Sequence, residues 1–181
     1  FLNHKVDRQN QAIMLRSSKM TIRGHNLSWG KRTYLMGILN ITPDSFSGDG
    51  LLGNQIDAEK SQLVKTALNM AQDFIAVGVD IIDIGGESTR PGSAPITLDE
   101  EKSRVIPIIQ ALSRDLDVLI SVDTYKAEVA KIAIESGADI VNDVWGLHAD
   151  PALAEVVARF KVPIILMHNR SSWVHAEVKE R

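Results

Sequence analysis

The sequence alternates between short apolar runs and longer segments with helical spacing, and this alternation limits the fold more than any other feature. The apolar runs cover residues 35–39, 79–84, 118–122, 140–141 and 162–167 and contain few charges. Strands buried on both faces of a parallel sheet have this composition. The segments between them carry apolar residues at helical spacing, with predicted helix caps at Asp57, Thr97 and Asp150. The pattern predicts an α/β fold with a parallel sheet.

Two architectures fit this alternation. An open, doubly wound sheet of five strands agrees with the chain length of 181 residues. A closed (β/α)₈ barrel needs roughly 250 residues. A barrel would therefore lack its last three strand-helix units, and the pattern alone leaves both architectures open.

The N-terminal part of the chain differs from the rest. Residues 1–19 are polar and aperiodic, so we expect an N-terminal extension there. From Met20 onward, two short strand-like runs flank the turn-prone sequence GHN, which predicts a β-hairpin before the first apolar run. Residues 20–181 are expected to form one domain.

Polar residues follow each of the five apolar runs. They are Asn40 after the first, Asp83 and the segment GGESTRPGS after the second, Asp123-Thr124 after the third, Asn142-Asp143 after the fourth, and His168-Asn169-Arg170 after the fifth. The opposite ends of the runs carry no comparable set. Because parallel α/β proteins bind ligands at the carboxyl ends of their strands, the pattern predicts one shared site.

The residue types in this predicted site suit two kinds of ligand group. Asp and Asn side chains can pair with the edge of a flat, nitrogen-rich heterocycle, whereas Ser, Thr, Arg and glycine N–H groups suit a phosphate. Each residue also has a simpler explanation. Asn40 and Asn142-Asp143 could form turns, Asp123 could cap a helix, and Arg90 could form a surface ion pair. Their shared position after strands favours the site.

Charge, cysteine content and motifs exclude several classes of protein. The 20 basic and 23 acidic residues give a net charge of −3 without a basic run, which argues against nucleic acid as a partner. The absence of cysteine removes disulfides, thiolate zinc sites and cysteine nucleophiles, and it suits a cytoplasmic protein. No apolar stretch approaches the roughly 20 residues of a membrane span. Without a histidine pair or a phosphate-binding glycine motif, any metal should be a hard ion such as Mg²⁺.

Four segments resemble dihydropteroate synthase, the folate-pathway enzyme family inhibited by sulfonamides. They are LMGILNITPDSFSGDG, VDIIDIGGESTRPGS, ISVDTYKAEVAKIAIESGADIVNDVWG and PIILMH, and the resemblance runs from about residue 29 to about residue 170. It implies a (β/α)₈ barrel, usually a homodimer. It also implies a reaction that joins 6-hydroxymethyl-7,8-dihydropterin diphosphate to p-aminobenzoate, giving 7,8-dihydropteroate and pyrophosphate. The implied partners are these small molecules, and neither nucleic acid nor a membrane.

The resemblance also implies roles for individual residues. Asn40 would bind the Mg²⁺ cofactor, and Asp123 and Arg90 would be catalytic. The other substrate-binding residues divide by ligand: Thr89 with Arg90 for the diphosphate or incoming anion, Phe46 and Pro91 for the p-aminobenzoate pocket, Asn142 with Asp123 for the pterin ring, Asp83 as a support from the second strand, and Met167 packing near the ring.

The chain departs from the family at its C-terminal side. Family members carry further site residues on later strands, including an aspartate, a lysine, and an arginine and histidine, and these have no counterpart before Arg181. We therefore expect an incomplete barrel of about five β/α units with weak or no activity by itself. Two alternatives stay open: a non-catalytic, truncated remnant, and the pterin-binding domain of a cobalamin-dependent methyltransferase. The methyltransferase domains lack the PDSFSGDG and STRPG loops.

Overall fold

The computed structural model describes residues 19–41, 56–88 and 93–168, without the side chains of residues 56–59. These residues fall into two compact units that divide between Tyr34 and Leu35. The predicted extension, apart from Lys19, lies outside the described residues.

The first unit contains the predicted β-hairpin. Strands β1 (Lys19–Ile22) and β2 (His25–Ser28) pair antiparallel, with Ile22 opposite His25. The two turn residues, Arg23 and Gly24, have φ angles of 44° and 83°. A two-residue turn with both φ angles positive matches the right-handed twist of the paired strands, and glycine adopts such an angle without steric cost. The hairpin prediction is confirmed.

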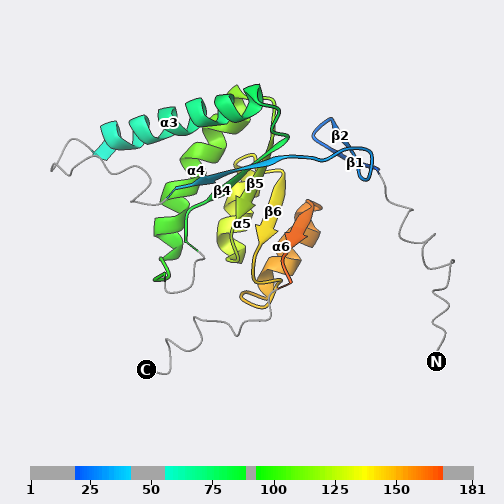
Figure 1. The fold of residues 1–181 in the computed structure, drawn as a ribbon. Helices are drawn as coiled ribbons and strands as arrows, with labels where there is room; N and C mark the ends of the chain where they lie inside the picture. Colours follow the sequence, from blue (N-terminus) through cyan, green and yellow to red (C-terminus); the bar gives the residue numbers. More distant parts are fainter. Residues whose placement is uncertain (1–18, 42–55, 89–92, 169–181) are drawn as a thin grey trace, which may run out of the picture. The chain divides into compact units, whose positions relative to one another are not determined.

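The second unit is a five-stranded parallel sheet with helices between consecutive strands (Figure 1). Its strands are β3 (Met36–Asn40), β4 (Ile81–Gly85), β5 (Leu119–Asp123), β6 (Ile140–Asp143) and β7 (Ile164–Leu166). Its helices are α3 (Ile56–Ala76), α4 (Leu98–Asp115), α5 (Ala127–Glu135) and α6 (Ala152–Phe160).

The order of the strands decides between the two architectures. In space the sheet runs β3-β4-β5-β6-β7, which is also the order along the chain. A doubly wound sheet reverses direction at a switch point, whereas a (β/α)₈ barrel advances by one strand at each step. The described strands therefore form part of a (β/α)₈ barrel, and the doubly wound alternative is excluded.

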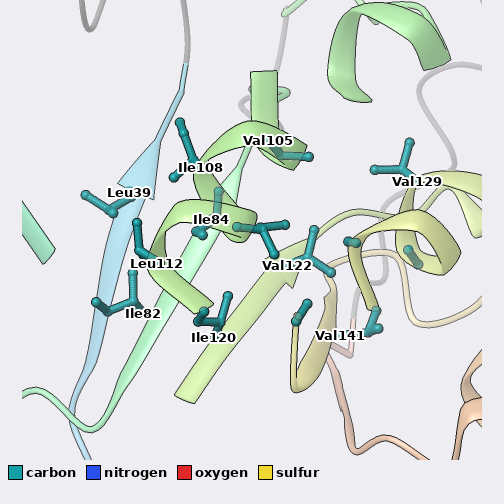
Figure 2. Close-up of a cluster of buried hydrophobic side chains, with 14 of the residues drawn as sticks. Leu39, Ile82, Ile84, Val105, Ile108, Leu112, Ile120, Val122, Val129 and Val141 are labelled. Atoms are coloured by element: carbon teal, nitrogen blue, oxygen red, sulfur yellow. The ribbon is translucent and has the colours of Figure 1, made fainter. Parts of the chain in front are cut away.

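The hydrophobic core lies between the helices and one face of the sheet (Figure 2). Strand residues Leu39, Ile84, Val122 and Val141 occupy matching register positions and are all buried in this core. The helices supply the opposing side chains, among them Val105, Ile108, Leu112, Val129 and Leu153. Because successive strand residues point to opposite faces, the neighbours of the core residues point away from the helices.

Local sequence signals account for two of the four helix starts. The Thr97 hydroxyl accepts a hydrogen bond from the Glu100 backbone N–H at 3.2 Å and caps α4 as predicted. Asp150 accepts from the Ala152 backbone N–H at 3.1 Å, at the start of α6. The predicted cap at Asp57 is wrong, because α3 begins at Ile56 and includes this residue.

Candidate functional site

Three of the predicted site residues lie in one row across the carboxyl ends of four neighbouring strands. Asn40 pairs with Gly85, Gly85 with Asp123, and Asp123 with Asn142. We call these four residues the strand-end row. Each follows directly after a strand residue that is buried against the helices, so the row belongs to the opposite face of the sheet. The barrel geometry thus places Asn40 and Asn142 in the same row, although they lie 102 positions apart in the sequence.

Gly85 has no side chain, so the side chains of its two row neighbours face the position of its missing Cβ atom. A Cβ atom added to Gly85 would lie 3.4 Å from Asn40 Oδ1, 3.5 Å from Asp123 Cβ and 3.6 Å from Asp123 Oδ2. An amide oxygen and a carboxylate oxygen from two different strands therefore face the position where any other residue would carry a side chain. Oxygen atoms so placed suit a hard cation or the hydrogen-bond donors of a ligand.

Asp83 lies one level deeper than the row, two residues before the end of β4. Its side chain is 3% exposed, and the Asn142 amide Nδ2 donates a hydrogen bond to Asp83 Oδ2 at 2.9 Å. Asp83 Oδ1 and the hydroxyl of Ser121, its register partner on β5, are buried without a hydrogen-bond partner among the described residues. Burial raises the pKa of Asp83, against the lowering effects of the nearby Ser121 hydroxyl and then of the Asn142 amide.

Asp123 carries the one carboxyl group of the strand-end row, and its pKa is strongly shifted. Burial, reinforced by the negative charge of Asp83 and then of Glu101, raises its pKa to about 7. Its carboxyl group therefore changes charge near neutral pH. A titratable group with such a shift, at the carboxyl end of a barrel strand, is typical of a functional site.

The structure separates the site residues from those that only form turns. Asp143 is fully buried and accepts hydrogen bonds from the backbone N–H groups of Trp145 at 2.8 Å and Leu147 at 2.6 Å. Asp143 therefore makes the turn after β6, whereas Asn142 faces Asp83. Similarly, the Thr124 hydroxyl accepts from the Lys126 N–H at 3.2 Å, so Asp123 is not needed as a cap.

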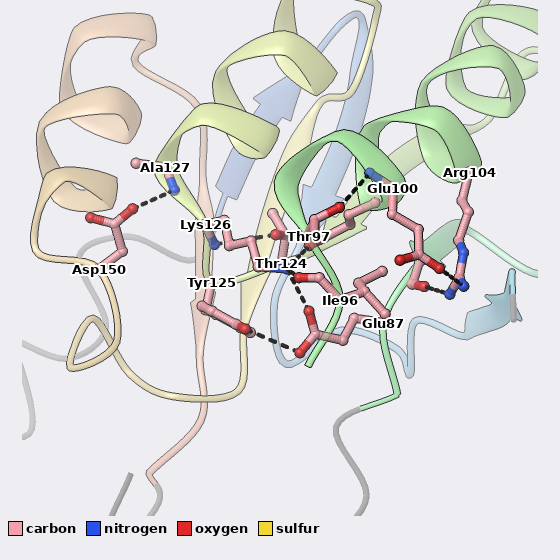
Figure 3. A network of polar contacts seen from close by, with 12 residues as sticks. Glu87, Ile96, Thr97, Glu100, Arg104, Thr124, Tyr125, Lys126, Ala127 and Asp150 are labelled. Atoms are coloured by element: carbon pink, nitrogen blue, oxygen red, sulfur yellow. Dashed lines mark hydrogen bonds and ion pairs between the residues drawn. The ribbon is translucent and has the colours of Figure 1, made fainter. Parts of the chain in front are cut away.

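A buried polar cluster beside the row was missed by reasoning from the sequence (Figure 3). Lys126 Nζ lies 2.5 Å from Glu87 Oε2 and 2.6 Å from Glu101 Oε2, and the Tyr125 hydroxyl donates to Glu87 Oε1 at 3.0 Å. We call these four residues the Lys126 cluster. They come from the β4–α4 connection, helix α4 and the β5–α5 turn. Glu87, which lies in the segment GGESTRPGS, was the only member of the cluster within a segment that the sequence had marked. The cluster itself could not be predicted, because no spacing in the sequence indicates contacts among residues from three separate elements.

The remaining predicted site residues are Phe46, Thr89, Arg90, Pro91 and Met167, of which the structure describes only Met167. Phe46, Thr89, Arg90 and Pro91 lie outside the described residues. Met167 is 45% exposed, and its backbone N–H donates to the Asp143 carbonyl at 3.0 Å.

The described residues contain no group of three His, Asp or Glu side chains arranged to hold a metal ion. None of the helices in that same part of the chain is long and apolar enough to cross a membrane.

Comparisons with known proteins identify relatives of this chain. The family model for pterin binding enzymes matches residues 36–180. The dihydropteroate synthase of Clostridium beijerinckii is 48% identical over 161 residues, which are 89% of this chain and 56% of that protein. The chain spans about half the length of the curated relatives it matches.

Solved structures support the same relationship. Dihydropteroate synthase from Xanthomonas albilineans with 4-aminobenzoic acid gives a TM-score of 0.69 at 39% identity, over 91% of this chain and 58% of that chain. The Burkholderia cenocepacia enzyme, complexed with 7,8-dihydropteroate, gives 0.68 at 37% identity, over 86% of this chain and 48% of that chain. The resemblance to dihydropteroate synthase is thus confirmed by sequence and by fold, and the chain belongs to the pterin-binding enzyme family.

Proposed function

We propose that the protein is a dihydropteroate synthase, which condenses 6-hydroxymethyl-7,8-dihydropterin diphosphate with p-aminobenzoate to give 7,8-dihydropteroate and pyrophosphate. The observation that carries this proposal is the strand-end row with Asp83 beneath it. The relatives named above are dihydropteroate synthases. One of their solved structures holds an arylamine and another holds dihydropteroate.

Pterin recognition is the role that best fits Asp83, Asp123 and Asn142. The pterin ring presents an amino group and ring N–H groups along one edge, and these need acceptors. Asp83 Oδ1 is a buried acceptor without a partner among the described residues, and Asp123 lies in the row above it. A buried acceptor left unpaired costs free energy, and a ligand N–H group can recover it. Met167, two residues beyond the register partner of Asn142, would pack against the ring.

Asn40 fits a Mg²⁺ ion that also binds the substrate diphosphate. Asn40 is exposed, and its Oδ1 atom lies beside the position that a Cβ atom on Gly85 would occupy. Mg²⁺ typically takes only one or two protein oxygen ligands and fills its remaining positions with phosphate oxygens and water. When bound, the ion would neutralise negative charge on the leaving diphosphate. Thr89 and Arg90, which follow β4 in the sequence, would contact the same anion.

The reaction needs no protein nucleophile. The C–O bond between the methylene carbon and the diphosphate breaks, the pterin ring spreads the positive charge left on the carbon, and pyrophosphate departs. The arylamine nitrogen then forms a C–N bond to that carbon and loses its proton to solvent. Asp123 in its ionised form would favour the cationic pterin, and Arg90 would stabilise the leaving group. Phe46 and Pro91 would shape the p-aminobenzoate pocket.

We further propose that the protein is a cytoplasmic homodimer. Its partners would be its two small-molecule substrates. The 181 residues by themselves should turn over weakly or not at all, because the chain spans about half of each curated relative. The remaining strands of those enzymes belong to the same barrel, whose active site draws on loops from several strands.

A coupled assay for pyrophosphate release tests the proposed function. With the protein at its natural length, release should require the pterin diphosphate, p-aminobenzoate and Mg²⁺ together. Asn142→Leu should reduce release, and the surface variant Lys102→Met should not. No release that depends on p-aminobenzoate would contradict the proposal and favour a non-catalytic remnant.

A further inference from the structure

Lys126 is bound more completely than an ordinary ion pair requires. Its Nζ atom contacts three acceptors: Glu87 Oε2 at 2.5 Å, Glu101 Oε2 at 2.6 Å and the Ile96 carbonyl oxygen at 2.9 Å. An ammonium group has three N–H donors, so all of them are used. The Lys126 side chain is 13% exposed, and those of Glu87 and Glu101 are 4% and 1% exposed.

The three acceptors hold both ends of the β4–α4 connection. Glu87 lies at the start of this connection, and Ile96 lies at its end, directly before the Thr97 cap of α4. Between them the Ser93 hydroxyl donates to the Ser88 hydroxyl at 2.8 Å, so the chain returns close to its starting point. One ammonium group thus contacts both ends of the connection, whose start is also held by the Arg104 guanidinium, which donates to the Gly86 carbonyl oxygen at 2.7 Å.

The same cluster is joined to the strand-end row through short stretches of backbone. Gly85 precedes Glu87 by two residues, and Asp123 precedes Lys126 by three. Gly85 and Asp123 are register partners on adjacent strands. A displacement of the start of the connection would therefore move the backbone at Gly85, beside the side chains of Asn40 and Asp123.

A gain in stability is a weak explanation for the Lys126 cluster. Buried ion triads can often be replaced by well-packed apolar side chains without loss of stability. Here two carboxylates share one ammonium group, which leaves net negative charge in a buried place. Glu101 and Glu87 both add to the rise in the pKa of Asp123. The cluster is therefore better explained by the geometry it imposes than by the stability it adds.

We propose that Lys126 is a positioning residue for binding of the pterin diphosphate: it acts through Glu87 and Ile96 on the β4–α4 connection and thereby on the Gly85 edge of the strand-end row. It does not contact the substrate itself. The inference rests on the proposed function for the identity of the ligand, and on the described contacts for the positioning.

The experiment compares Lys126→Met with Lys102→Met in the protein at its natural length. Lys102 is a matched control, because its Nζ atom also bridges two carboxylates, Asp99 at 2.8 Å and Glu128 at 3.0 Å, but lies outside the connection. The readouts are the dissociation constant of 6-hydroxymethyl-7,8-dihydropterin diphosphate by calorimetry, its KM in the pyrophosphate assay, and amide hydrogen exchange at residues 86–88, 93, 94 and 96.

Lys126→Met should weaken binding and raise KM by about tenfold or more, because small misplacements of binding groups are costly. It should also speed exchange at the amides on both sides of the connection. Lys102→Met should change none of these, and Lys126→Arg should keep most of the affinity. A folded Lys126→Met protein with the parent's dissociation constant and exchange rates would overturn the inference, whatever its melting temperature.

Two further outcomes are distinguishable. If Lys126→Met does not fold, Glu87→Gln takes its place, since it keeps the side-chain volume and removes one charge; unchanged binding in that variant overturns the inference. If the parent binds the pterin diphosphate without turnover, the proposed function fails while the binding comparison still decides the role of Lys126. A parent that does not bind this ligand overturns both.

Discussion

The Asn142 side chain reaches from β6 across β5 and donates a hydrogen bond to Asp83 on β4 at 2.9 Å. The two strands are not neighbours, so this contact joins three strands of the sheet at the level of the proposed pterin pocket. It also leaves Asp83 Oδ1 as an acceptor for something else. One carboxyl oxygen of Asp83, Oδ2, thus stabilises the sheet through Asn142, and the other, Oδ1, can accept a hydrogen bond from a ligand.

Removal of the Asn142 amide should therefore affect stability and binding together. We expect Asn142→Leu to lower the free energy of unfolding by about 1–3 kcal/mol, because it leaves a buried carboxyl group without its donor. Urea denaturation measures the change. In an Asp83→Leu background the same substitution should cost much less, and an equal cost in both backgrounds would show that the hydrogen bond is not the cause.

Substitution by alanine should affect ligand affinity at Gly85 and stability at Gly86. In Gly85→Ala the new Cβ makes only ordinary contacts, at 3.4 Å or more, but occupies the space between Asn40 and Asp123. Stability should stay within about 1 kcal/mol of the parent, whereas affinity for the pterin diphosphate should fall sharply. In Gly86→Ala the Cβ would lie 2.8 Å from Val105 Cγ1, and overpacking should cost about 1–3 kcal/mol. Thermal unfolding and calorimetry on both variants test this contrast.

Activity should depend on pH through Asp123. With its pKa at about 7, the carboxylate gains its charge as the pH rises through neutrality, and kcat/KM should rise over the same range. Asp123→Asn should be much less active and should lack this rise. A pH–rate profile with the same rise in the variant would assign it to another group.

The same group should reduce stability at high pH. Its folded pKa of about 7 lies above the ordinary value of 3.8, so between these limits the folded state keeps a proton that the unfolded state has lost. Stability conferred by the protonated group is present at low pH and is lost as the pH rises through about 7. At a pH above that value, Asp123→Asn should therefore raise the free energy of unfolding, by about 1–2 kcal/mol given the partial exposure of the group. A variant less stable than the parent at that pH contradicts the assignment.

Asp150 offers a substitution that should affect stability alone. Its Oδ2 atom accepts from the Ala127 N–H at 2.8 Å and its Oδ1 atom from the Ala152 N–H at 3.1 Å, at the starts of α5 and α6. Asp150→Ala should lower the free energy of unfolding by about 1–2 kcal/mol for each lost cap. Asp150→Asn, with one acceptor oxygen, should recover part of the loss. Neither variant should change kcat/KM, and a change would extend the site to this turn.

The sequence predicted the strands of the parallel sheet well, because each strand coincides with a short apolar run that polar residues follow within a few positions. It left the barrel and the doubly wound sheet undecided, since these differ in strand order, and order depends on pairing between distant segments. The sequence also did not decide whether Asn142 and Asp143 belong to the site or to a turn, although adjacent strand residues point to opposite faces of the sheet. The Lys126 cluster was out of reach, because its members meet only after three elements have packed together.

The sequential order β3 to β7 has a consequence for how the chain can be synthesised. Each strand pairs with the one made just before it, so a segment leaving the ribosome finds its partner edge already in place. Every pairing within the described sheet joins strands that are consecutive along the chain. The growing sheet can therefore assemble unit by unit during translation, while the outer edge of β3 and the edge of the newest strand stay unpaired until the barrel closes.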